Sequence, residues 1–278
     1  MNKLCVRELD AFLMMAGNDD TKRTKYDFEK HFDPGGYLSY YWPSHTVDDE
    51  DRFILRFFFS KIDKHKDKFQ DKIWLEFSGG PIIDKYFSGS KYVKEIWHSA
   101  YTNASQQNIA SFFETHGQTY DWTKRLKFAS DLESGDAKTI LNRIMKKVQK
   151  ILPCDASLPN GGISEDLCPS VNILSVHSVP ECITPNKTEC FQFMTNIFSI
   201  LKNPGDILLM SVNVECQNWQ SNDEVQFPCA YVSANEVLAV LRDEGFIDIE
   251  FEIFENCGAG DDVKSQMDKT LALIAFKK

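Results

Sequence analysis

A glycine-rich turn after a short apolar run has the spacing of a nucleotide-binding element. Ile73–Phe77 is predicted as a buried strand, Ser78-Gly79-Gly80-Pro81 as a tight turn, and Ile82–Phe87 as a short helix. A second strand is expected over Tyr92–His98, at the distance that a βαβ unit requires. In such units the turn after the first strand cradles a nucleotide, so we expect the turn's backbone to face a ligand.

The end of the second predicted strand departs from the nucleotide-binding pattern. An acidic residue normally stands there and hydrogen-bonds the ribose, but this chain has Ala100. A ribose held by two hydrogen bonds to a carboxylate gains roughly 1.5–3 kcal/mol from each. Alanine would forfeit about 3–6 kcal/mol of cofactor binding, which is a factor of roughly a hundred to ten thousand in affinity.

Helices that alternate with strands must position this turn. Helices are expected over residues 3–16, after the cap Asp48, and over Ser105–Glu114, Asp136–Gln149, Lys187–Leu201 and the stretch capped by Ser233 and Glu236. Strands are expected over Leu126–Ser130, Val171–Val176, Asp206–Val214, Ile247–Phe254 and Leu271–Phe276, with Lys150–Cys154 extended. A break is expected at Pro34-Gly35-Gly36. This order predicts one Rossmann-like α/β domain over residues 1–278, with an N-terminal helical lid (1–66) and a core (67–278).

Composition and charge exclude several classes of protein. The net charge of −10 argues against a nucleic-acid partner. The N-terminus has no secretory signal pattern, and no apolar run reaches membrane length, so we expect no membrane partner. The eight cysteines form no CxxC pair and no histidine stands at metal spacing, so no zinc site is predicted. We expect a cytoplasmic protein with reduced thiols.

Four motifs together resemble one family of enzymes. They are HFDPGGYLSYY (His31–Tyr41), SGGP (Ser78–Pro81), YDWTKRLKFASDLE (Tyr120–Glu133) and LKNPGDILLMSV (Leu201–Val212). They are similar to motifs of the nicotinamide, phenylethanolamine and indolethylamine N-methyltransferases, which are class I S-adenosylmethionine (SAM) enzymes. The likeness runs from about Tyr26 to the C-terminus and is strongest before Glu133. It implies a seven-stranded sheet with helices on both faces, and methyl transfer from SAM to a small amine or pyridine nitrogen.

The resemblance also implies roles for individual residues. Tyr37 and Tyr41 would fold over the cofactor and Tyr40 would face the methyl acceptor, because aromatic faces attract a sulfonium or ammonium cation. As ordinary packing residues of a helix, the same tyrosines would need no ligand. Glu76 would position the amino-acid end of SAM, Gly79, Gly80 and Tyr101 would lie along the cofactor, and Asp155 would meet the adenine amine.

Six positions depart from the family pattern, of which Glu76 keeps a carboxylate but is one methylene longer than the family's aspartate. Ser78 replaces a glycine that lets the backbone approach the ligand. Asp84 replaces a tyrosine and adds a negative charge near the turn, and Ala100 replaces the ribose-binding aspartate. Val176 replaces a threonine on the fourth strand, and Ser211 replaces an aspartate of the acceptor site. Together these changes predict an eroded cofactor site.

Neighbouring polar residues offer substitutes at the acceptor end. Glu215 can bind an amine in place of the missing aspartate, and Glu181 would make the pocket more acidic; as a loop residue in solvent, Glu215 needs no such role. His177, at the end of the fourth strand, can act as a general base. A histidine hydrogen-bonded within the protein is the commoner case.

Two readings of function follow. In the first, the chain is a pseudoenzyme that binds or scaffolds an unidentified protein partner and needs no cofactor. Its lid then packs permanently, lid aromatic side chains fill the vacant pocket, and tyrosine hydroxyls donate to Glu76 and Asp84. In the second, the chain is an active N-methyltransferase that uses SAM and a small amine acceptor.

Overall fold

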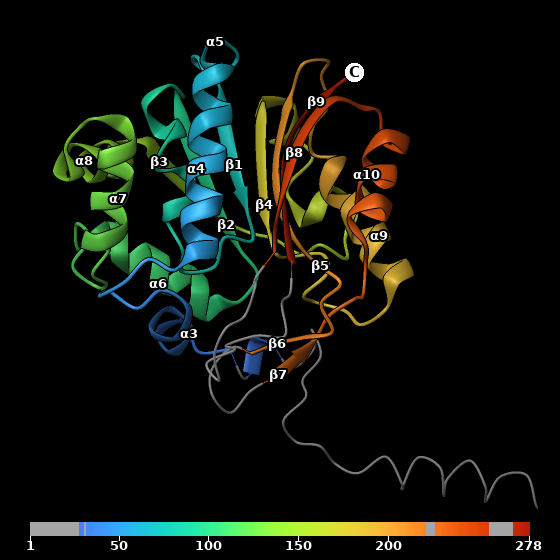
Figure 1. Cartoon of the computed structure of the whole chain (residues 1–278), viewed down its shortest axis with the longest axis horizontal. Coiled ribbons are helices and arrows are strands. Elements are labelled where there is room, and N and C mark those ends of the chain that lie inside the picture. The colour runs from blue at the N-terminus through green and yellow to red at the C-terminus, as the bar shows by residue number, and fades with distance from the viewer. Residues whose placement is uncertain (1–27, 31, 221–225, 256–268) are drawn as a thin grey trace, which may run out of the picture.

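The computed structural model describes residues 28–30, 32–220, 226–255 and 269–278, and a mixed seven-stranded sheet forms its centre (Figure 1). The strands are β1 Ile73–Phe77, β2 Glu95–Ala100, β3 Val148–Pro153, β4 Ile173–His177, β5 Ile207–Val214, β8 Phe246–Glu255 and β9 Lys269–Lys277, with a separate hairpin of β6 Asn218–Gln220 and β7 Gln226–Pro228. The order is β3-β2-β1-β4-β5-β9-β8. Strands β1 to β5 pair in parallel, and β9 runs antiparallel to both β5 and β8. The predicted α/β fold is confirmed.

Helices cover both faces of this sheet (Figure 1). They are α3 Pro34–Tyr41, α4 Asp49–Lys64, α5 Lys66–Phe69, α6 Asn103–Glu114, α7 Thr123–Glu133, α8 Ala137–Lys147, α9 Lys187–Phe198 and α10 Ala234–Asp243. Short 3-10 turns are η1 Asp84–Tyr86, η2 Gly89–Lys91, η3 Pro159–Gly162 and η4 Cys168–Ser170. Residues of α4, α6, α7 and α8 share one apolar core with the sheet, and those of α9 and α10 share the other. The order reverses between β1 and β4, where α/β sheets open a crevice at the carboxyl ends of their strands.

Helix-capping signals in the sequence are confirmed. The Asp48 side chain accepts from the Asp51 backbone at 2.8 Å and begins α4, as predicted. Asp136, expected as the first residue of a helix, caps α8 instead by accepting from the Thr139 backbone. Ser233 and Glu236 form the predicted capping box of α10. These contacts span only a few residues, so local sequence is enough to predict them.

The secondary structure predicted for three segments is wrong. The strand expected over Leu126–Ser130 lies within α7, whose buried residues recur at helical spacing, and β3 is the third strand. The helix expected over Ile82–Phe87 is replaced by the 3-10 turn η1, and a second turn, η2, follows it. The expected break at Pro34-Gly35-Gly36 begins α3 instead, because Asp33 caps this helix and proline suits its first position.

Other predictions are shifted or fall outside the described part of the chain. The second strand begins later than expected and ends at Ala100. The helix predicted over residues 3–16 lies outside the described residues, as do His31 and the loop between the last two strands.

Candidate functional site

A cavity of about 170 Å³ opens between α3, α4 and the carboxyl ends of β1, β4 and β5. Nine residues predicted for the site line it: Tyr37, Tyr41, Glu76, Ser78, Gly79, Gly80, Tyr101, Asp155 and Ser211. The other four predicted residues, Tyr40, Ala100, Val176 and Glu215, lie in the described part of the chain but do not line this cavity. Tertiary structure therefore brings most of the predicted site together around one cavity.

The glycine-rich turn is shaped by its neighbours. A Cβ added to Gly79 would lie 2.6 Å from His98 Cε1 and 2.7 Å from Glu76 Cγ, so only glycine fits. His98 Nε2 donates to the Gly80 carbonyl at 2.8 Å, and burial lowers the pKa of His98 to about 4. Ser78 adopts a left-handed φ of 53°, which strains a residue with a Cβ. Its backbone N–H donates to Ser99 Oγ at 3.0 Å.

Glu76 lies at the end of β1 and is buried. Its Oε2 is hydrogen-bonded to Ser175 Oγ and lies 3.9 Å from His177 Nε2. Burial raises the pKa of Glu76 to about 8, although the Ser175 hydroxyl opposes this shift. The predicted tyrosine donor to Glu76 is therefore wrong: the partner is Ser175 on the neighbouring strand.

The ribose end of the site contains no carboxylate at the predicted position. Ala100 is the last residue of β2 and is fully buried. The nearby hydroxyl of Thr102 donates to Ser105 Oγ at 2.8 Å, so these two side chains satisfy each other. Asp155 Oδ1 accepts from both the backbone and the hydroxyl of Ser157, at 2.8 and 2.7 Å. Thr102, Ser105 and Asp155 thus have hydrogen-bond partners within the protein.

Helix α3 is tied to the core without filling the cavity. Tyr120 Oη donates to the Leu38 carbonyl at 3.0 Å, and Trp42 Nε1 donates to Asp84 Oδ2 at 2.9 Å. Tyr37 and Tyr41 pack with their ring centroids 5.1 Å apart and line the cavity, while Tyr40 packs edge-on against Tyr41. The expectation that lid side chains fill the pocket is wrong, because the cavity remains between them and the sheet.

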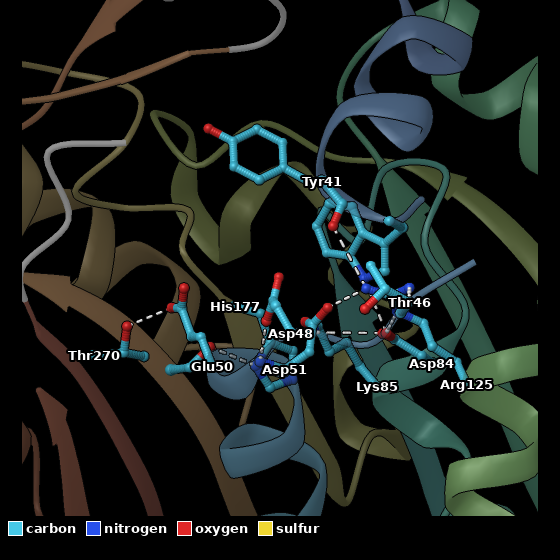
Figure 2. Close-up of polar contacts among 12 residues, drawn as sticks. Tyr41, Thr46, Asp48, Glu50, Asp51, Asp84, Lys85, Arg125, His177 and Thr270 are labelled. Carbon is cyan, nitrogen blue, oxygen red and sulfur yellow. Dashed lines mark hydrogen bonds and ion pairs between the residues drawn. The ribbon is translucent and has the colours of Figure 1, made fainter. Parts of the chain in front are cut away.

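A buried ionic cluster of Asp51, Asp84, Lys85 and Arg125 lies beside the cavity (Figure 2). Arg125 Nη2 donates to Asp51 Oδ2, and Arg125 Nε lies 3.3 Å from Asp84 Oδ2. Lys85 Nζ lies 3.5 Å from Asp84 Oδ1 and 3.9 Å from Asp51 Oδ1. Burial opposes the charge on Lys85, yet both carboxylates raise its pKa above the ordinary value. Asp84 is thus held by Trp42, Lys85 and Arg125, and the predicted tyrosine donors are wrong.

At the acceptor end, Ser211 and His177 lie on paired positions of β5 and β4. His177 Nδ1 is hydrogen-bonded to Ser211 Oγ at 2.9 Å. Burial and the positive charge of Lys85 lower the pKa of His177 well below its ordinary value, so the ring is neutral. Val176 is fully buried in the sheet core, and Glu215 pairs with Lys269 Nζ at 3.1 Å. Both residues were predicted to belong to the site, but neither lines the cavity.

Several lining residues were missed by the sequence analysis. Trp219 of the β6–β7 hairpin packs on Tyr37 at a centroid distance of 5.9 Å. Asp51 and Lys85 line the cavity from α4 and η1, Cys182 lines it from the loop after β4, and Asn213 lines it from β5. No motif marks these residues, although alternation along β5 places Asn213 on the same face as Ser211.

We also searched the described residues for metal sites, disulfides and membrane-spanning helices. The described residues contain no group of three or more His, Cys, Asp or Glu side chains arranged to hold a metal ion. Six buried cysteines of the same ranges are free thiols. No helix in this part of the chain has the length and apolarity needed to cross a bilayer.

Comparisons with known proteins identify the family to which this sequence is similar. The family model described as the NNMT/PNMT/TEMT family matches residues 21–277. The indolethylamine N-methyltransferase of Oryctolagus cuniculus is 27% identical over 228 residues, which are 81% of this chain and 85% of the relative. The nicotinamide N-methyltransferase of Sus scrofa is 24% identical over 238 residues, 83% and 88% of the two chains.

A solved structure shares the fold at much lower identity. Magnesium protoporphyrin IX methyltransferase of Synechocystis PCC 6803 with bound SAM has a TM-score of 0.53 and 7% identity. The match covers 91% of this chain and 95% of that one. At this identity the likeness supports the class I methyltransferase fold alone.

Proposed function

This chain belongs to the NNMT/PNMT/TEMT family, and on that premise we propose that it is a pseudoenzyme. In this proposal the protein keeps the ligand cavity of a SAM-dependent N-methyltransferase but holds SAM weakly. It acts as a binding or scaffolding module for an unidentified protein partner. The observation that carries the proposal is the methyl group of Ala100, buried at the end of β2 where a ribose-binding carboxylate is expected.

Groups elsewhere in the site support weak cofactor binding. The carboxylates of Asp84 and Glu76 are engaged by protein donors, and Asp155 Oδ1 is engaged by Ser157. Ser78 keeps a Cβ in the turn despite its left-handed backbone. A site that has lost two charge-assisted hydrogen bonds loses about 3–6 kcal/mol of binding, enough to move a micromolar affinity to the millimolar range.

The active N-methyltransferase remains the second candidate, and one observation favours it. Gly79 and Gly80 at the cofactor end and Tyr41 and Ser211 at the acceptor end line one continuous cavity. SAM bound there would supply an electrophilic methyl group to a small amine or pyridine nitrogen. The aromatic lid would exclude water from that reaction.

Calorimetric titration of SAM and S-adenosylhomocysteine into the purified protein tests the proposal. We expect a dissociation constant near the millimolar range, about −4 kcal/mol, because the ribose has no carboxylate partner at Ala100. S-Adenosylhomocysteine is a matched control because it lacks the sulfonium charge but keeps the ribose. A low-micromolar constant for either compound would reject the pseudoenzyme and favour the active enzyme.

A further inference from the structure

Unpartnered polar atoms gather at the ends of β4 and β5. Among the described residues, His177 Nε2, Glu181 Oε2 and Asn213 Oδ1 are buried without a hydrogen-bond partner. Leaving a buried polar atom unpaired is unfavourable, so native proteins pair such atoms with water or ligand. Two of these residues, His177 and Asn213, line the cavity.

The imidazole of His177 is held with Nε2 free. Nδ1 is bonded to Ser211 Oγ at 2.9 Å, and the ring packs edge-on against Phe58 at a centroid distance of 5.1 Å. Glu76 Oε2 lies 3.9 Å from Nε2, which is beyond hydrogen-bond distance. The side chain is only 7% exposed, so a partner for Nε2 must come from within the cavity (Figure 2).

Asn213 is held near the carboxyl end of β5 by its own contacts. Its backbone N–H donates to Glu181 Oε1 at 2.8 Å, and its amide nitrogen lies 3.5 Å from Cys182 Sγ. Because β5 side chains alternate between faces, Asn213 points to the same side as Ser211, the strand partner of His177. An amide oxygen and an imidazole nitrogen, both without a partner, therefore belong to residues that line the same cavity.

Lys85 already places a positive charge near His177, so the charges in this part of the cavity disfavour a cationic ligand. Lys85 is near enough to lower the pKa of His177, and the same positive charge opposes an ammonium at that place. Glu76 Oε2 lies 3.9 Å from His177 Nε2, but burial raises the pKa of Glu76 to about 8, so this carboxyl group is mostly protonated at neutral pH. Asp51 is paired with Arg125, and Glu50 accepts from Thr270 Oγ1. A hydroxyl suits the place better, since it donates or accepts as the imidazole tautomer requires and carries no charge.

We propose that His177 and Asn213 form a subsite for a neutral aromatic alcohol, in place of the charged amine that an acceptor-site carboxylate would bind. The ligand's hydroxyl meets Nε2 and Oδ1, and its ring lies against Tyr37, Tyr41 and Trp219, which line the same cavity. The inference rests on the proposal above that the protein keeps the ligand cavity of its family, and it does not require SAM.

A matched set of probes tests the subsite by calorimetry. 2-Phenylethanol, 2-phenylethylamine (an ammonium at neutral pH) and ethylbenzene share a ring and chain and differ in the polar group. We expect the alcohol to bind about five-fold or more tightly than either of the others, which is the size of one neutral hydrogen bond. Equal binding, tighter binding of the amine, or no binding of the alcohol would overturn the proposal.

Variants of His177 separate the subsite from general packing. His177→Leu should abolish the preference for the alcohol, whereas His177→Gln, which keeps a polar atom near Nε2, should retain most of it. His45→Leu, at an exposed histidine outside the lining, is the control and should behave as wild type. A folded His177→Leu protein that keeps the full preference would refute the subsite.

Ser211→Asp decides the question if His177→Leu fails to fold. It places a carboxylate beside His177, so the preference should invert toward 2-phenylethylamine. If folded Ser211→Asp keeps the preference for the alcohol, the residues around His177 do not select the polar group of the ligand, and the subsite is rejected. Failure of the subsite is distinguishable from failure of the pseudoenzyme proposal, because the latter is decided by the separate SAM titration.

Discussion

At the residue scale, the cavity contains a carboxyl group that keeps its proton near neutral pH. Glu76 is buried at the end of β1, and Ser175 is its hydrogen-bond partner. Burial raises its pKa to about 8. A SAM site that used this carboxyl group to attract the ligand's ammonium group would need it ionised, and in the proposed pseudoenzyme the protonated form weakens that attraction.

Glu76→Gln is expected to flatten the dependence of stability on pH. Because the folded pKa is raised from 4.5 to about 8, the stability that Glu76 contributes is full below 4.5 and is lost as the pH rises to 8. Glutamine mimics the protonated form and does not titrate. Between about pH 6.5 and 8.5, thermal unfolding should show the Tm of wild type falling relative to the variant. Parallel Tm curves for the two proteins would contradict the raised pKa.

At the element scale, α3 is a lid with fixed attachments. Asp33 caps its first turn, Tyr120 Oη binds the Leu38 carbonyl, and the adjoining Trp42 binds Asp84. A lid that opens for a cofactor belongs to the least stable part of a protein. These contacts favour a lid that stays closed.

Hydrogen exchange on the ligand-free protein measures this property. We expect amides from Leu38 to Trp42 to exchange slowly and at the same rate after SAM is added, because their contacts involve no ligand. Amides of β1 provide the slow reference. Fast exchange over α3 that slows with SAM would show a working lid and would favour the N-methyltransferase.

At the scale of the whole molecule, the buried ionic cluster joins three separate segments. Asp51 comes from α4, Asp84 and Lys85 from η1, and Arg125 from α7. The cluster thereby attaches the N-terminal helical region to the sheet's first crossover and to the helices that follow it. Its two acids and two bases balance, which is a requirement for burying charges at all.

Arg125→Met should destabilise the protein by about 3–5 kcal/mol, because it leaves buried carboxylates without their partner. Urea unfolding measures the change in the free energy of unfolding. Lys127→Met is the matched control: it breaks the exposed i,i+4 pair with Asp131 and should cost less than about 0.5 kcal/mol. A loss below about 1 kcal/mol for Arg125→Met would mean that the buried cluster contributes no more than a surface pair.

Local sequence determined those features that depend on neighbours along the chain. The capping residues Asp48 and Ser233, the turn at Gly79-Gly80 and the alternation of helices and strands were all predictable. Their causes, such as a side chain that accepts from a backbone N–H three residues away, act within one helical turn. The absence of a carboxylate at Ala100 was equally visible in the sequence.

Tertiary structure alone decided which side chains meet. Trp42 and Asp84 are 42 residues apart, Asp51 and Arg125 are 74 apart, and Glu76 and Ser175 are 99 apart. The sequence led us to expect tyrosine donors for Glu76 and Asp84, because it does not show which serine or tryptophan the fold brings close to them. The stretch Leu126–Ser130 was mistaken for a strand for the same reason. Its helical face is defined by the apolar core against which it packs, and tertiary packing overrides the preference of a short apolar run.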